Sequence, residues 1–195
     1  KVFLTDLNNT QGIFDLHVLG GSLEFDHIID PAFIASNISH DIDIAILNDT
    51  NRMFVLAWCE ETDDTASYQV LYSNGSAHKA ANTFASSAGD SCRISVSALN
   101  TTGFVLAYAN WSSTDTDWII HGFDINDGNL FSPIIIDSDT DQNVDVGICA
   151  LNSTRYASVF MDDLDNDATF VIYDLATQIV GQTDVDVAAD PDVRD

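Results

Sequence analysis

Basic residues are almost absent from this chain: two Lys and four Arg occur among 195 residues, and the formal net charge is -25. Binding to nucleic acid or to an anionic membrane surface depends on clustered Lys and Arg, so the composition disfavours both. No apolar run approaches the roughly 20 residues that span a bilayer, and membrane insertion is not predicted. Basic proteins, cations and neutral sugars remain as classes of partner.

Glutamate is also scarce, with three Glu against 28 Asp. Adaptation to high salt usually raises both acids, so an excess of Asp alone needs another cause. The short Asp carboxylate caps its own backbone in turns and supplies ligands in cation-binding loops. The composition therefore indicates many turns or bound cations.

Cysteine is too rare for a disulfide framework, and its count is odd: Cys59, Cys92 and Cys149. Each lies in or beside an apolar strand-like run, which favours small buried side chains over functional thiols. A Cys59–Cys92 bridge is compatible with the sequence but is not determined by it.

Catalytic signatures are missing as well. No G-x-S-x-G, H-E-x-x-H, P-loop or Cys–His arrangement occurs. The five histidines occupy unrelated positions and show no paired spacing: His17, His27, His40, His78 and His121. Of these, His17 and His121 fall in strand-like runs and are expected to be satisfied sheet residues. Carboxylates suited to a secreted hydrolase are plentiful, but nothing singles out a pair. We therefore predict a protein without enzymatic activity.

A four-residue pattern that recurs along the chain is the main positive signal. It reads LNNT at 7–10, LNDT at 47–50, LNTT at 99–102 and LNST at 151–154. Stretches of period two precede it, as in IDIAIL and ISVSAL, which is typical of strands with one buried side. A second apolar stretch follows it, MFVLAWC, GFVLAYA and RYASVFM, each with an aromatic residue near its end.

The spacing of this pattern predicts the architecture. The four turn asparagines stand 40, 52 and 52 residues apart. Four short strands fit in each interval, and repeats of this kind are typical of propeller blades. We predict an all-β fold of four tandem four-stranded antiparallel units, at about 1–40, 41–91, 92–143 and 144–195. A closed four-bladed ring, an open stack and a segment of a larger array all remain compatible, and a β-sandwich is less favoured because it requires no internal period.

Residues 41–187 resemble a tandem repeat of about 50 residues found in large secreted bacterial surface proteins, many of which also carry RTX-type calcium repeats. The matching positions are Phe104 to Tyr108, then Phe123, Asp124, Gly128 and Asn129, with Gly89-Asp90 and Asp141-Gln142 as the closing motif. The resemblance implies a propeller-like fold and extracellular display, without a defined activity. The chain departs from the family at its first turn, which is N-x-T in place of D-G.

The N-x-T turn is also the acceptor sequence for N-glycosylation. A structural explanation exists: Asn tolerates the left-handed conformation of a hairpin, and Thr suits the strand that follows. Chance would give about two such sequences with 14 Asn, yet seven occur. We expect N-linked glycans at Asn8, Asn37, Asn48, Asn74, Asn100, Asn110 and Asn152.

Two further sites are weaker predictions. The stretch DSDTDQNVD places oxygen donors at alternating positions, as in a Ca²⁺ loop, although it lacks the turn glycine and the final acidic ligand. Its candidate ligands are Asp137, Asp139, Asp141, Asn143 and Asp145. Trp111 and Trp118 flank a loop and are candidates for stacking against a sugar, whereas Trp58 is expected in the core.

Together these features favour an extracellular or cell-surface structural glycoprotein, a repeat unit of a coat, adhesin or fibre that associates with itself or with neighbouring repeats. The alternative hypothesis is a Ca²⁺-dependent, lectin-like module that binds carbohydrate.

Overall fold

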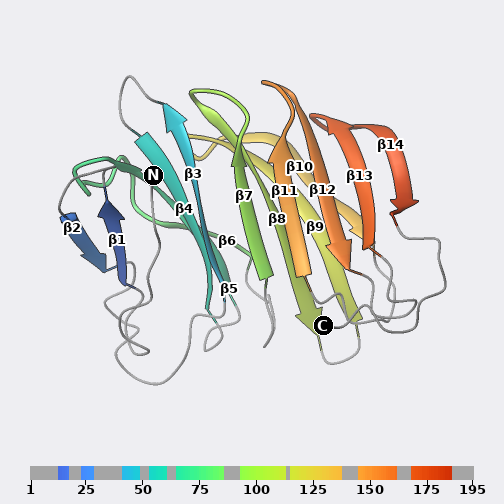
Figure 1. Cartoon of the computed structure of the whole chain (residues 1–195), viewed down its shortest axis with the longest axis horizontal. Helices are drawn as coiled ribbons and strands as arrows, with labels where there is room; N and C mark the ends of the chain where they lie inside the picture. The colour runs from blue at the N-terminus through green and yellow to red at the C-terminus, as the bar shows by residue number, and fades with distance from the viewer. Residues whose placement is uncertain are drawn as a thin grey trace.

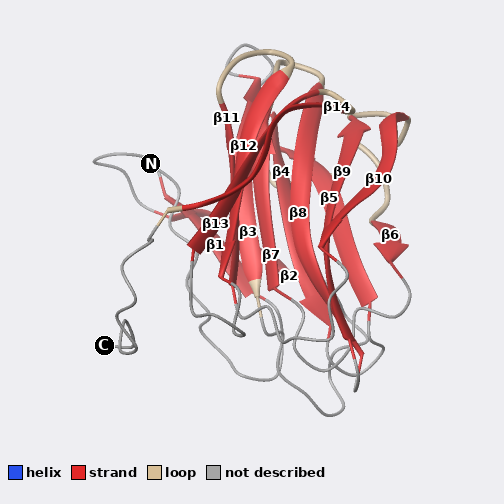
Figure 2. Cartoon of the chain, turned by 90° about the vertical axis from the view of Figure 1, so that its right-hand side faces the viewer, coloured by secondary structure: helices blue, strands red, loops and turns tan. Residues whose placement is uncertain are grey.

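A computed structural model of the chain describes residues 13–17, 23–28, 41–48, 53–60, 65–85, 93–112, 115–137, 145–161 and 168–185. These residues form strands joined by short turns (Figures 1 and 2). No helix in this part of the chain is long and apolar enough to cross a membrane.

The described strands form one two-stranded sheet and three four-stranded sheets. The two-stranded sheet pairs β1 (Ile13–His17) with β2 (Leu23–Ile28). The second sheet contains β3 (Ile42–Asn48), β4 (Met53–Glu60), β5 (Thr65–Tyr72) and β6 (Asn82–Ala85). The third contains β7 (Arg93–Ala98), β8 (Gly103–Ser112), β9 (Asp115–Asp124) and β10 (Asn129–Asp137). The fourth contains β11 (Asp145–Ala150), β12 (Arg155–Met161), β13 (Ala168–Asp174) and β14 (Thr177–Asp184).

Every four-stranded sheet is an antiparallel meander in which neighbours along the chain pair with each other. None of the sheets closes on itself as a barrel, and the three are stacked side by side as open, blade-like units (Figure 1). The predicted all-β fold of antiparallel four-stranded units is confirmed for these three sheets.

Burial follows the position of each sheet in the stack. In β12, Tyr156, Ser158 and Phe160 are buried while the residues between them are not, as the period of two predicts. In β8 of the middle sheet both faces are buried, because a sheet packs against each side. Ile46 departs from the predicted pattern: it alternates with Ile42 and Ile44 but is largely exposed.

The first strands of the three sheets lie next to one another and are joined by side chains. Asp41 Oδ2 accepts the backbone N–H of Ile94 (2.9 Å), and Asp43 Oδ2 accepts that of Val96 (2.8 Å). The bonded residues advance together along β3 and β7, so these strands run in the same direction.

The same link recurs between the third and fourth sheets, with serine in place of aspartate. Ser95 Oγ accepts the N–H of Ile148 (3.3 Å), and Ser97 Oγ accepts that of Ala150 (2.9 Å). Each bond spans 53 residues, one more than the repeat. In Figure 1, β3, β7 and β11 accordingly follow one another across the stack.

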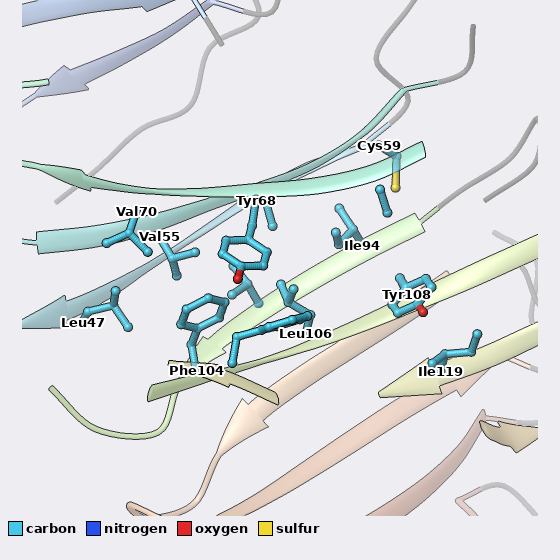
Figure 3. Close-up of a cluster of buried hydrophobic side chains, with 14 of the residues drawn as sticks. Leu47, Val55, Cys59, Tyr68, Val70, Ile94, Phe104, Leu106, Tyr108 and Ile119 are labelled. Atoms are coloured by element: carbon cyan, nitrogen blue, oxygen red, sulfur yellow. The ribbon is translucent and has the colours of Figure 1, made fainter. Parts of the chain in front are cut away.

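Apolar side chains fill both spaces between the stacked sheets. Figure 3 shows the core between the second and third sheets, where Tyr68 meets Phe104 edge to face at a ring separation of 5.0 Å. Between the third and fourth sheets, Trp118 packs on Phe160 at 4.1 Å. A third cluster lies on the other face of the second sheet and includes Leu56 and Leu71.

The hydrogen bond between sheets predicts that replacing two equivalent aspartates, Asp41 and Asp145, will lower the free energy of unfolding by different amounts. Asp41→Ala removes an acceptor from Ile42 N–H and Ile94 N–H and should lower the free energy of unfolding by about 1–3 kcal/mol. Asp145 occupies the same position in β11 and is exposed, and among the described residues its side chain accepts only the N–H of Val146. Asp145→Ala should therefore cost no more than about 0.5 kcal/mol. Denaturant unfolding measures both, and equal losses would contradict a stabilising role for the bond between sheets.

Candidate glycan-bearing turns

The turn between β7 and β8 is built around the side-chain oxygen of Asn100. Asn100 Oδ1 accepts the backbone N–H of Thr102 (2.9 Å) and its hydroxyl (3.1 Å). The backbone N–H groups of Leu99 and Asn100 donate to the carbonyl of Gly103. Asn and Thr are therefore both needed in this turn, and the residue between them is not.

The turn between β11 and β12 repeats this arrangement. Asn152 Oδ1 accepts the N–H of Thr154 (2.9 Å), its hydroxyl (3.3 Å) and the N–H of Arg155 (2.8 Å). The N–H groups of Leu151 and Asn152 donate to the Arg155 carbonyl, as their counterparts do to Gly103. The two turns share these hydrogen bonds as well as their sequence pattern, and the bond from Arg155 N–H to Asn152 Oδ1 is additional.

A third turn has the N-x-S form of the acceptor sequence and uses the same side-chain hydrogen bonds at another place in its sheet. Between β5 and β6, Asn74 Oδ1 accepts the N–H (3.0 Å) and the hydroxyl (2.7 Å) of Ser76. Gly75 adopts a φ of 79° there, a conformation that glycine permits without strain.

These contacts correct the structural explanation expected for the N-x-T pattern. Among the described residues, a positive φ occurs at Asp127, Leu175 and Gly75, so neither Asn100 nor Asn152 adopts the left-handed conformation. Asparagine is used instead as a side-chain acceptor that replaces a backbone turn.

The equivalent turns lie against each other along one edge of the stack. Asn100 Nδ2 donates to the carbonyl of Ser153 at 3.3 Å. Asn74, Asn100 and Asn152 are all exposed. Because the turns use the amide oxygen, the nitrogen that would carry a glycan is not required to hold them.

The other predicted glycosylation sites are described only in part. Asn48 and Asn110 end or lie within β3 and β8, and their side chains fall outside the described part of the chain. Asn8 and Asn37 lie outside the described residues altogether. Their glycosylation stays a prediction from sequence.

The candidate Ca²⁺ loop also falls largely outside the described residues. Asp139, Asp141 and Asn143 lie outside the described residues, and Asp137 is described by its backbone alone. Asp145 is described and exposed at the start of β11. Within the described ranges, no three His, Cys, Asp or Glu side chains form a group that could hold a metal ion.

The two candidate sugar-stacking tryptophans have different outcomes. Trp118 is 0 % exposed and packs on Phe160, so the expectation that it offers a face to a sugar is wrong. Trp118 lies in β9, between two sheets. The sequence alone could not distinguish this position from one beside an exposed loop. The side chain of Trp111 lies outside the described part. Trp58 is in the core, as predicted.

The stretch FDINDGN at residues 123–129 joins β9 to β10 through a tight turn. Asp124 Oδ1 accepts the N–H groups of Asn126 (2.7 Å) and Gly128 (2.9 Å). A Cβ at Gly128 would lie 2.6 Å from Asp124 Oδ2, so a larger residue there would displace the carboxylate. Asp124 therefore forms this turn, which is one of the two roles that the excess of Asp predicts.

Three other titratable side chains differ in their burial: His121, Cys59 and Cys149. His121 is 5 % exposed and its ring lies 4.0 Å from that of Phe123. Burial lowers the pKa of His121 to about 4, and the Asn129 side chain offsets only part of this effect. Neither ring nitrogen of His121 has a hydrogen-bond partner among the described residues, so the expectation of a satisfied sheet histidine is wrong. Cys59 is buried and disulfide-bonded, whereas the Cys149 thiol is free and exposed.

Comparisons with known proteins add little. No family model matches the chain, and no curated protein matches it. Among solved structures, a triple arginine-to-alanine mutant of AofleA from Arthrobotrys oligospora is similar at 10% identity and a TM-score of 0.33, over 92% of this chain and 67% of that one. A likeness this low carries no argument about fold or function.

The turn geometry predicts that oxygen, not nitrogen, is what the fold needs at Asn152. Asn152→Ala removes the acceptor of three hydrogen bonds and should lower the free energy of unfolding by about 1–2 kcal/mol. Asn152→Asp keeps an acceptor and should change it by less than about 0.5 kcal/mol. Thermal or denaturant unfolding of the unglycosylated protein measures both, and an equal loss in the two variants would contradict this role.

The burial of His121 predicts a loss of stability in acid. Its folded-state pKa of about 4 lies below the usual histidine pKa of 6.5, so the unfolded chain binds the proton first as the pH falls. The stabilisation is complete above pH 6.5 and is lost as the pH drops towards 4, by an amount on the order of 3 kcal/mol. His121→Leu should remove this component. Unfolding free energies at several pH values test it, and parallel pH profiles for the two proteins would refute it.

Proposed function

We propose that the chain is an extracellular, non-catalytic structural glycoprotein whose repeated sheets present N-linked glycans along one edge. The observation that supports this most is the pair of equivalent turns at Asn100 and Asn152. Both asparagines are exposed, and each lies in an N-x-T sequence. Two glycans one repeat apart would therefore leave the stack at the same edge, because the turns lie against each other.

The disulfide at Cys59 supports the proposed location. Disulfides persist in oxidising compartments and are rare in the cytosol. Attachment of N-linked glycans requires passage through a secretory compartment, which is oxidising as well. The two features are consistent with a secreted or cell-surface protein.

The open stack supports the proposed structural role. Each sheet packs on the next through an apolar core and a row of polar bonds between first strands. Such a repeat can be extended without changing its interfaces. The net charge of -25 would keep such an assembly soluble and would make its packing sensitive to salt.

Glycan occupancy is the direct test of this function. The chain should be secreted from a eukaryotic cell line and its intact mass measured before and after enzymatic removal of N-glycans. We expect a loss of mass on deglycosylation, with glycopeptides that contain Asn74, Asn100 and Asn152. A secreted chain whose mass equals that of the bare polypeptide would overturn the proposal.

Single Asn→Asp variants provide matched controls. Each keeps the oxygen acceptor that the turn uses and removes the amide nitrogen. Asn100→Asp and Asn152→Asp should each lose one glycan without a change in fold, as judged by circular dichroism. Asn126→Asp, in a turn without the acceptor sequence, should leave the glycan mass unchanged.

A further inference from the structure

Within the described part of the chain, no sheet packs on one face of the sheet at the β14 end of the stack. Strand pairing places Val159 opposite Gly147 in β11 and opposite Phe170 in β13, so these residues share one side of the sheet. We call this side the terminal face. Its residues are Gly147, Cys149, Ala157, Val159, Met161, Ala168, Phe170, Ile172 and Val180.

The positions of the terminal face are buried in the other two sheets. Val159 is 47 % exposed, whereas Ala57 and Ala107, which occupy its position in β4 and β8, are 0 % exposed. Met161, 37 % exposed, corresponds to Cys59 and Ala109, which are also buried. The difference is the absence of a further sheet within the described chain, because in both other cases the next sheet covers these residues.

The leucine of the repeated turn follows the same rule. Leu47 and Leu99 are buried, and each belongs to the core shared with the following sheet. Leu151 is 54 % exposed. The leucine of the L-N-x-T pattern thus has a packing role in the first two of these turns that Leu151 does not fulfil.

The polar part of the interface is also present on the β11 edge. Asp145 stands where Asp41 stands in β3, and its Oδ1 accepts the N–H of Val146 as Asp41 Oδ1 accepts that of Ile42. In Asp41 the second oxygen accepts an N–H from the first strand of the next sheet. Asp145 is exposed, so its Oδ2 can accept the same bond from another first strand.

We propose that the terminal face binds the first unit, residues 1–40, of a second copy of this chain, so that copies join head to tail. The inference rests on the proposed structural function and names its assembly surface. The occupant must be a sheet whose first strand precedes an L-N-x-T turn, because both internal interfaces are of this kind.

The first unit carries the residues that such a partner needs. Its sequence aligns Val2 and Leu4 with Ile94 and Val96 of β7, which pack on the second sheet. In the second strand of the unit, Phe14 aligns with Phe54. The corresponding face of the second sheet is already buried in the chain, so the terminal face of another copy cannot pack there. Because the two surfaces differ, the contact is heterologous and extends into an open chain of copies.

Association should be tested by sedimentation velocity over a range of protein concentrations. The solution should contain about 1 M NaCl, where the Debye length of about 3 Å screens repulsion between acidic copies. We expect species larger than dimers that grow with concentration. Val159→Lys places a charge at the centre of the terminal face and should weaken association by about tenfold or more.

The matched control is Ile135→Lys. Ile135 is exposed in β10 of another sheet, and its replacement should leave association unchanged. Circular dichroism and thermal unfolding of both variants establish that each is folded. A Val159→Lys variant that is folded but associates like the parent protein would overturn the proposal.

Mixing experiments distinguish this arrangement from its alternatives. Labelled Val159→Lys protein keeps its first unit and should bind the terminal face of unmodified chains, shortening the assemblies. If unmodified protein stops at dimers and excludes the labelled variant, the contact is a symmetric pairing of two terminal faces, and the proposal is wrong. A chain that stays monomeric at every concentration also overturns it, whereas glycans on that monomer would leave the proposed function standing.

Discussion

The stack depends on hydrogen bonds that join the first strand of one sheet to the first strand of the next. Strands within a sheet use their backbone groups on each other, but the first strand of each meander has an unpaired edge. In β7 and β11 the N–H groups on this edge are taken by side chains from the preceding sheet, Asp41 and Asp43 in one case and Ser95 and Ser97 in the other. The bonds fix the distance and direction of neighbouring sheets, and the apolar cores then pack between them.

The repeated turn combines three roles within four residues. Its leucine packs on the following sheet, its asparagine oxygen replaces part of the backbone bonding, and its threonine supplies two donors to that oxygen. The amide nitrogen takes no part in the bonds within the turn, although that of Asn100 donates to the carbonyl of Ser153 in the neighbouring turn. This division is why a structural turn and a glycan acceptor can share one sequence without conflict, and why the pattern by itself does not decide between them.

Much of the architecture could be predicted from the sequence. The period of two in ISVSAL and the aromatic residues of GFVLAYA correspond to β7 and β8, and the antiparallel units follow from their spacing. The candidate functional site was harder to predict from the sequence. Trp118 looked like a loop-flanking residue, but β9 carries it into the core, because burial depends on which sheet faces a side chain and not on its distance from a turn. The hydrogen bonds that Asp43 and Ser95 make to the next sheet could not be predicted from a sequence motif. Aspartate is the acceptor in one repeat and serine in the next.

By itself the sequence determined that the chain is strand-rich, repetitive and acidic, with a turn that needs Asn and Thr or Ser at fixed positions. These properties are local, because they follow from side-chain alternation and from hydrogen bonds across two or three residues. The tertiary structure decided which faces are covered. Ala57, Ala107 and Val159 occupy the same position in three sheets, yet only Val159 is exposed. That outcome depends on what lies across the interface, which no residue specifies alone.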